Sequence, residues 1–187
     1  VYIMPIQTPI CDFGQKAIPF ELKSTENTVI TLNDIKGDNG TLVMFICNHC
    51  PYVKAVTKEI VEDCNELKKI GINAVAICSN DAVSHPEDSF ENMIEFSKRN
   101  NFNFPYLVDE TQEIAKAYDA VCTPDFFGYN KNLELQYRGR LRELKNLIPV
   151  KDGESDLLKA MKQIAETSEG PKEQIPSAGC SIKWKID

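Results

Sequence analysis

Two cysteines separated by two residues form the part of the chain best suited to chemistry. Cys47 and Cys50 lie in LVMFICNHCPYVK, residues 42–54, where an apolar run ends just before Pro51. Proline favours the first turn of a helix, so Cys50 is predicted at a helix N-terminus. The helix dipole and the unpaired N–H groups there stabilise a thiolate, the nucleophilic form of cysteine. We therefore predict that Cys50 is a redox nucleophile and that a protonated His49 would add positive charge beside it.

Three interpretations of this pair stay open: a redox motif, a metal site or two buried thiols. A Cys-x-x-Cys pair closes a disulfide only where the chain brings the two Cα atoms to about 5–6 Å. Zinc would need four ligands, which on paper are Cys47, His49, Cys50 and Cys180. The chain has two histidines and no second Cys-x-x-Cys motif, so we predict no metal ion.

The other five cysteines carry weaker signals. Cysteine is among the most buried residue types, and four are predicted to be small core side chains: Cys11, Cys64, Cys78 and Cys122. Cys180 has two interpretations. It is either a partner that resolves an oxidised Cys50 or a buried residue that anchors the C-terminal tail beside Trp184.

Composition limits the class of protein. The 187 residues are 42% hydrophobic and 26% charged, which is typical of a globular domain. The net charge of -7 opposes binding to nucleic acid or an anionic membrane. Seven irregularly spaced cysteines do not indicate a secreted disulfide framework, and the first residues lack the features of a signal peptide. We therefore expect a cytoplasmic protein.

The hydrophobic pattern predicts one α/β domain over residues 1–187, with a central mixed sheet and helices on both faces. Residues 1–16 are an N-terminal extension, and 170–187 are a tail packed on the domain. Strands are predicted at 41–46, 72–78 and 104–109, with hairpins joining 17–22 to 27–32 and 125–129 to 133–139. Helices are predicted at 53–70, 90–99, 111–118 and 157–168.

The dipeptide Thr123-Pro124 is the second chemical clue. It opens the predicted strand at 125–129. X-Pro bonds adopt the cis form far more easily than other peptide bonds, and a proline that opens a strand often marks a constrained turn. A trans proline that starts a strand is the plain alternative.

Together these stretches resemble the peroxiredoxin-like branch of the thioredoxin superfamily, the AhpC/TSA (alkyl hydroperoxide reductase/thiol-specific antioxidant) group. The resemblance rests on residues 20–37, LVMFICNHCPYVK, AICSND, TPDFF, LELQYRGR and the tail PSAGCSIKWK. It implies a thioredoxin-like fold with Cys50 at the start of the helix after LVMFI. It also implies a cis Thr123–Pro124 bond that faces this cysteine, contacts an extended substrate and keeps metal out.

The chain departs from the family's patterns. Val53 stands where thioredoxins have their second cysteine, and Met44 where many have a buried acid. In the peroxidatic motif P-x-x-x-[TS]-x-x-C, Cys47 takes the Thr/Ser position and Val43 the Pro position. The candidates for a peroxide-binding arginine are Arg138, Arg140 and Arg142.

The resemblance implies a thiol-disulfide oxidoreductase or antioxidant protein. Cys50 and Cys47 are its candidate catalytic residues, Cys180 a candidate resolving residue, and Thr123, Pro124 and His49 the candidate substrate groove. No cofactor is expected. The expected partners are a protein with a disulfide, or a small disulfide or peroxide, together with an external thiol reductant and another copy of the chain. A thiol peroxidase and a non-catalytic binding module are the alternatives.

Overall fold

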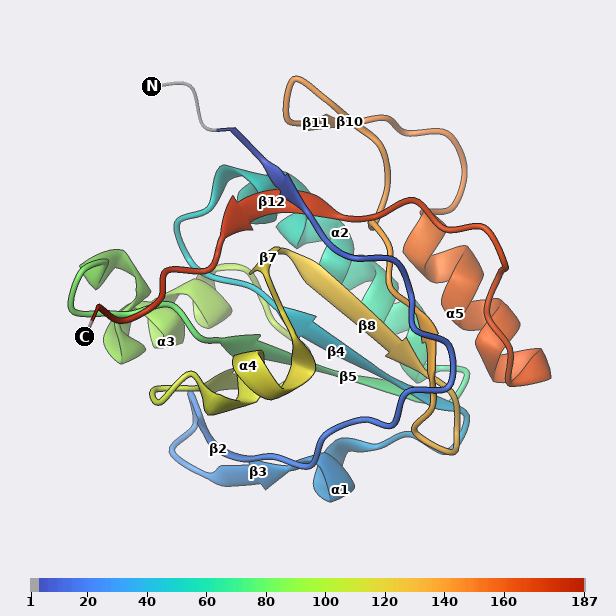
Figure 1. The fold of residues 1–187 in the computed structure, drawn as a ribbon, viewed down its shortest axis with the longest axis horizontal. Helices are drawn as coiled ribbons and strands as arrows, with labels where there is room; N and C mark the ends of the chain where they lie inside the picture. The colour runs from blue at the N-terminus through green and yellow to red at the C-terminus, as the bar shows by residue number, and fades with distance from the viewer. Residues whose placement is uncertain (1–3, 187) are drawn as a thin grey trace.

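A seven-stranded sheet forms the centre of the protein. The structure is a computed structural model that describes residues 4–186. The strand order is β3-β2-β6-β5-β4-β8-β9 (Figure 1). The strands are β2 (Glu21–Ser24), β3 (Val29–Thr31), β4 (Gly40–Phe45), β5 (Ile72–Cys78), β6 (Tyr106–Val108), β8 (Asp125–Tyr129) and β9 (Leu135–Tyr137).

The sheet is mixed, as predicted. Strands β4, β5 and β6 are parallel, whereas β8 and β9 add antiparallel on one side. The predicted N-terminal hairpin is β2 with β3, and β2 also pairs with β6. The hairpin is therefore an edge of the central sheet and not an appendage to it.

Alternation along β4 explains why both faces of the sheet are covered. Leu42 and Met44 pack on one face with α2 (Pro51–Lys68), α3 (Phe90–Arg99) and α5 (Asp156–Thr167). Val43 and Phe45 pack on the other face with α1 (Leu32–Ile35) and α4 (Glu113–Tyr118). All six residues of β4 are buried, which accounts for its unbroken apolar run.

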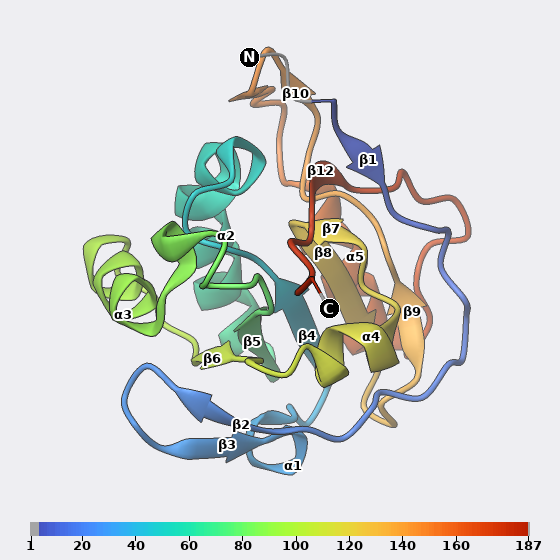
Figure 2. The ribbon, with the colours of Figure 1, turned by 60° about the vertical axis from the view of Figure 1, so that its left-hand side comes forward.

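Two small sheets were not predicted. One pairs β10 (Leu144–Lys145) with β11 (Ile148–Pro149). The other has the order β1-β12-β7 and joins β1 (Ile6–Gln7), β12 (Ala178–Ser181) and β7 (Cys122–Thr123). Through it the two terminal segments lie side by side and cross the end of the central sheet, next to the start of α2 (Figures 1 and 2). None of the helices within residues 4–186 is long and apolar enough to cross a membrane.

Candidate redox site

The loop between β4 and α2 holds the two cysteines. Strand β4 ends at Phe45 and α2 begins at Pro51, so Cys50 is the N-cap residue of the longest helix in the described structure. Its side chain is fully buried. The backbone N–H of Val53, in the first turn of α2, hydrogen-bonds the Cys50 sulfur and lowers its pKa. The sequence-based placement of Cys50 at a helix start is therefore what the structure has.

Three thiols meet at this helix end. The thiols of Cys180 and, to a smaller extent, Cys47 hydrogen-bond the sulfur of Cys50, and these bonds lower the pKa of Cys50 far below its ordinary value against the opposing effect of burial. The same bonds, with burial, raise the pKa values of Cys47 and Cys180. The arrangement thus favours one thiolate, on Cys50, and two protonated donors beside it.

Thr123 contacts the cluster through two of its groups. Its peptide bond to Pro124 is cis. Its carbonyl oxygen lies 3.3 Å from the Cys50 sulfur and accepts a hydrogen bond from the protonated thiol. Its hydroxyl lies 3.5 Å from the Cys47 sulfur and also hydrogen-bonds Cys50, which lowers the pKa of Cys50. Sequence reasoning found no hydroxyl at position 47, but the fold supplies one from Thr123.

Cys180 lies on strand β12, which positions it beside Cys50 and Cys47. The strand pairs antiparallel with β7, with Cys180 opposite Thr123 and Ser181 opposite Cys122. Gly179 packs so tightly that a Cβ atom there would lie 2.0 Å from the Thr123 carbonyl oxygen. The Ser177 hydroxyl donates a 2.7 Å hydrogen bond to the Pro124 carbonyl. The edge beside Thr123, predicted as a substrate groove, is therefore occupied by the chain's own tail.

His49 turns towards a buried carboxylate. Its Nδ1 lies 2.7 Å from Asp88 Oδ2, and its ring stacks on His85 with centroids 5.7 Å apart. The close contact with Asp88, an ion pair when His49 is protonated, raises the pKa of His49, although burial opposes the shift. The Cys50 thiolate acts in the same direction, so the imidazolium and the thiolate stabilise each other.

Asp88 organises the loop and was not found from the sequence. It accepts 2.8 Å hydrogen bonds from the Asn48 backbone N–H and the Asn80 side chain. Burial works to raise the pKa of Asp88, but the hydrogen bonds from His49, Asn80 and Asn48 outweigh it and lower the pKa. Tyr106 completes the network with a 2.8 Å bond to Asn48 Oδ1. No local pattern links these residues, which come from four separate segments.

The candidate metal ligands are only partly brought together. Among residues 4–186 the group that could share an ion is Cys47, His49 and Asp88, whose donor atoms lie within 4.8 Å of one another. Thiolate, imidazole and carboxylate are ligands that zinc accepts. The structure thus adds Asp88 to the predicted ligands. It leaves Cys50 and Cys180, which were predicted as ligands, outside the group. The hydrogen bonds of Asp88 to His49, Asn48 and Asn80 account for its position without an ion.

The remaining residues considered from the sequence are four cysteines outside the thiol cluster and three arginines that form ion pairs with other residues. Cys64, Cys78 and Cys122 are buried, whereas Cys11 is half-buried. Burial raises the pKa values of Cys64 and Cys122. It also raises the pKa of Cys78 to about 12 and is the main reason that the pKa of Cys11 is raised to about 11. The three arginines all form ion pairs: Arg138 with Asp125, Arg140 with Asp156 and Arg142 with Glu59.

Comparison with known proteins agrees with this geometry. The pattern of the family described as AhpC/TSA matches residues 13–143, more than half of the chain and inclusive of the loop before α2. The chain belongs to the AhpC/TSA family. A search of curated proteins found no match.

Two solved structures, both of proteins described without a function, are similar to this AhpC/TSA protein over the full chain. An uncharacterised conserved protein from Geobacillus kaustophilus is 43% identical, with a TM-score of 0.93 and full coverage of both chains. A hypothetical protein from Sinorhizobium meliloti 1021 is 32% identical, with a TM-score of 0.87 and full coverage of both chains.

A more distant neighbour identifies the fold. The thioredoxin domain of a thiol-disulfide oxidoreductase from Bacteroides vulgatus is 15% identical over 67% of this chain and 86% of its own, with a TM-score of 0.58. The fold is therefore thioredoxin-like, as the sequence resemblance implied.

Proposed function

We propose that this protein is a thiol-dependent oxidoreductase in which Cys50 is the nucleophile and Cys180 the resolving cysteine. One observation carries the proposal: Cys50 is buried at the start of α2, and Cys180 lies opposite Thr123, whose carbonyl oxygen is 3.3 Å from the Cys50 sulfur. A lowered thiol pKa beside further thiols is the arrangement that disulfide exchange requires.

A complete cycle of disulfide exchange needs only Cys50, Cys180, the substrate disulfide and an external thiol. The Cys50 thiolate attacks a disulfide R–S–S–R′, forms Cys50–S–S–R and releases R′–S⁻. The Cys180 sulfur then attacks the Cys50 sulfur, displaces R–S⁻ and leaves a Cys50–Cys180 disulfide, while its proton passes to the displaced thiolate. Two equivalents of an external thiol reduce this disulfide and are themselves oxidised to a disulfide.

Cys180 is favoured over Cys47 as the resolving residue. Its hydrogen bond is the largest single cause that lowers the pKa of Cys50. It also lies on a short outer strand, whereas Cys47 lies between β4 and α2, deep in the core. Formation of a Cys50–Cys180 disulfide therefore requires only β12 to move. Cys47 stays the alternative partner.

Burial of the cluster favours hydroperoxides as a second substrate class. Cys50 and Cys47 are at most 1% exposed, and β12 fills the edge beside Thr123. A small oxidant can enter with little opening, whereas a protein disulfide must displace β12. Attack of Cys50 on a hydroperoxide gives a sulfenate and an alcohol or water, and Cys180 condenses with the sulfenic acid to release water. Because the three candidate arginines are paired elsewhere, the Thr123 hydroxyl is the donor available for the peroxide.

A disulfide map tests the proposal. The protein is oxidised with one equivalent of diamide or of hydrogen peroxide, its free thiols are blocked, and it is digested with trypsin. Cys47 and Cys50 share the tryptic peptide 37–54, whereas Cys180 lies in the peptide 173–183. We expect these two peptides to be cross-linked in the wild type and in Cys47→Ser, and to be separate in Cys50→Ser.

The matched control is Cys11→Ser, because Cys11 is a half-buried cysteine outside the cluster. Cys50→Ser is expected to abolish reduction of glutathione disulfide or hydroperoxide by dithiothreitol, whereas Cys11→Ser retains it. A peptide 37–54 that has lost two hydrogens without cross-linking would assign the resolving role to Cys47. Full activity of Cys50→Ser would reject Cys50 as the nucleophile, and absence of activity in the wild type would favour the binding module.

A further inference from the structure

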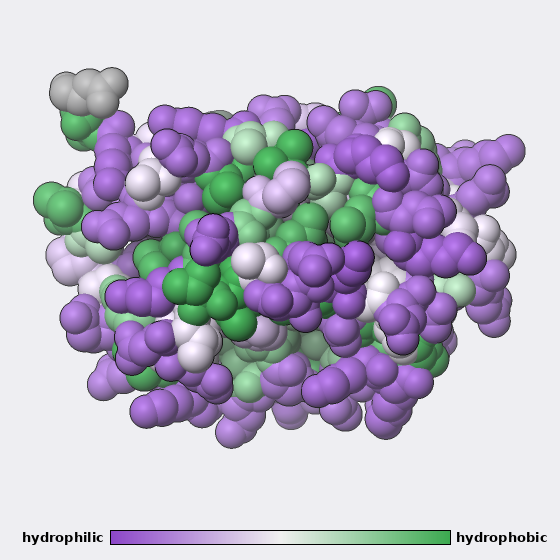
Figure 3. Space-filling view, turned by 90° about the horizontal axis from the view of Figure 1, so that it is seen from below, coloured by the Kyte–Doolittle hydropathy of each residue, from purple (hydrophilic) through white to green (hydrophobic). Residues whose placement is uncertain are grey.

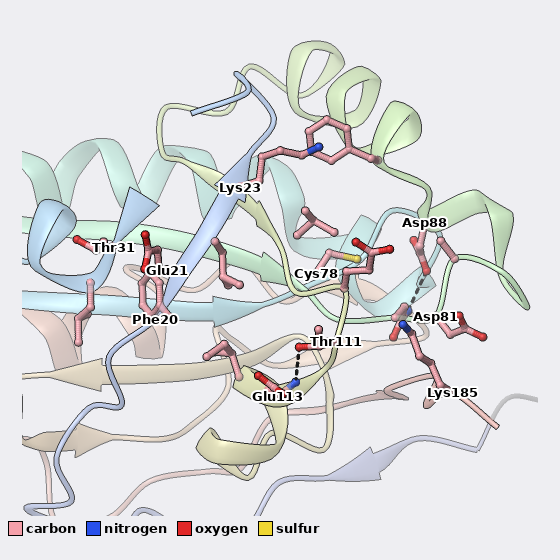
Figure 4. A pocket seen from close by; sticks show the side chains of 18 of the residues that line it. Phe20, Glu21, Lys23, Thr31, Cys78, Asp81, Asp88, Thr111, Glu113 and Lys185 are labelled. Atoms are coloured by element: carbon pink, nitrogen blue, oxygen red, sulfur yellow. Dashed lines mark hydrogen bonds between the residues drawn. The ribbon is translucent and has the colours of Figure 1, made fainter. Parts of the chain in front are cut away.

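A large cleft lies on the other side of Asp88 from the thiols. Its volume is about 1110 Å³, at the upper end of what small-molecule sites occupy. Its walls come from β2, the loop after β5, and the segment from β6 into α4 (Figure 4). None of Cys47, Cys50 and Cys180 lines it. The cleft is therefore a separate site that shares the wall at Cys78, Asn80 and Asp88 with the redox region.

The floor of the cleft is apolar. Phe20 and Leu32 are buried there. Leu22 and Ile114 are half-buried against the second core cluster, and Val108 is half-buried against the first. On the face of the molecule that carries the β2–β3 hairpin, apolar surface gathers amid polar groups (Figure 3). Binding of a hydrocarbon body over such a floor is favourable by roughly 25 cal/mol per Å² of apolar surface removed from water.

The rim of the cleft is strongly acidic. Five carboxylates line it against two ammonium groups: Glu21, Asp81, Asp88, Glu110 and Glu113 against Lys23 and Lys185. Figure 4 shows Glu21, Asp88 and Glu113 around the cleft, on β2, the 3₁₀ turn η1 (Pro86–Asp88) and α4. The rim therefore carries a net negative charge at neutral pH.

Part of this charge has no partner in the protein. The charge of Asp88 is balanced by His49, and Asp81 accepts hydrogen bonds from Ser84. In contrast, Glu21, Glu110 and Glu113 form no ion pair with any residue of the described range 4–186. The ammonium of Lys23 lies over the Phe90 ring, 4.1 Å from its centroid, and is engaged there.

We propose that this cleft binds an amphipathic organic cation, a small molecule with an ammonium head and an apolar body. The apolar floor takes the body, and the unpaired glutamates at the rim attract the head. An anion with the same body meets the same floor but an unfavourable field. The ligand class thus follows from the combination of floor and rim.

A matched pair of probes tests the proposal by titration calorimetry on the full chain. The probes are 3-phenylpropylamine and 4-phenylbutyrate, which share a phenylpropyl body and differ in the sign of the head group. We expect the amine to bind at least roughly tenfold more tightly at low salt and to weaken as sodium chloride is added.

The double variant Glu110→Gln/Glu113→Gln is expected to weaken the amine roughly fivefold, because exposed ion pairs each contribute under about 1 kcal/mol. The control Glu166→Gln/Glu173→Gln makes the same change of charge at exposed residues outside the cleft and is expected to leave the affinity unchanged. The proposal is overturned if the amine does not bind, if the butyrate binds equally well, or if both double variants act alike. None of these results bears on the redox role of Cys50.

Discussion

Cys180 lies directly opposite Thr123 in the β12–β7 pair, and this register brings its thiol to the sulfur of Cys50. The tail thereby occupies the strand edge next to Cys50. Access to Cys50 and the protonation of Cys50 consequently depend on the same short strand.

The first prediction concerns Gly179. A side chain there meets the Thr123 carbonyl oxygen at 2.0 Å, and backbone cannot give way cheaply. Gly179→Ala is expected to weaken β12 by at least about 1.4 kcal/mol, so that Cys50 reacts about tenfold faster with a bulky maleimide. Ser181→Ala, at an exposed position of the same strand, is the control. Equal maleimide rates in the wild type and Gly179→Ala would show that β12 does not limit access.

The second prediction concerns the hydroxyl of Thr123. Thr123→Val keeps the shape of the side chain but removes the donor beside Cys47 and Cys50. The pKa of Cys50 is expected to rise by the equivalent of about 1 kcal/mol, the net value of one hydrogen bond. Thiolate absorbance at 240 nm against pH measures this. Thr123→Ser retains the hydroxyl and should behave as wild type, and a similar rise in both variants would point to packing instead.

The third prediction concerns Asp88 and pH. The folded pKa of His49 is raised by Asp88, so this pair stabilises the protein fully below the unfolded pKa of about 6.5, and the stabilisation is lost as pH rises through the folded value. Asp88→Asn is expected to lower the His49 pKa and to cost about 1–3 kcal/mol of stability at pH 6, since Asp88 is buried and hydrogen-bonded.

Imidazole chemical shifts and urea denaturation at pH 6 and pH 8 measure both effects. Glu87→Gln is the comparison, because it removes one negative charge at the exposed neighbouring residue; this charge also raises the pKa of His49 but by less than Asp88, so a smaller decrease is expected. A His49 pKa that is unchanged in Asp88→Asn would contradict the assigned role of Asp88.

The fourth prediction separates a buried ion pair from an exposed one on the same carboxylate. Arg142 holds Glu59 at 2.6 Å with both groups buried, whereas Lys151, 63% exposed, reaches Glu59 only at 3.5 Å. Arg142→Met leaves a buried charge without its partner and is expected to cost about 3–5 kcal/mol. Lys151→Met is expected to cost under about 1 kcal/mol. Urea denaturation compares them, and similar costs would refute the distinction.

The amino-acid sequence by itself determined the central architecture and the position of Cys50 at a helix start. Strand β5, strand β8 and helix α3 have the bounds predicted from their patterns, because buried strands and amphipathic helices leave a local record of apolar spacing. The start of α2 was likewise marked by Pro51 after a buried strand. The single-turn helix α1 and the two-residue strands were missed, since they are too short to show a period.

Only the tertiary structure decided what surrounds Cys50. Cys180 reaches it from 130 positions further along the chain through a pair of short strands, and Asp88 contacts the same loop through a hydrogen bond from Asn48 and an ion pair with His49. The Thr123 hydroxyl replaces the one that the family motif would place at residue 47. Hydrogen bonds between distant segments leave no periodic signal, so the sequence named Cys180 and Thr123 only as candidates, and their contacts with Cys50 and the role of Asp88 were decided by the tertiary structure.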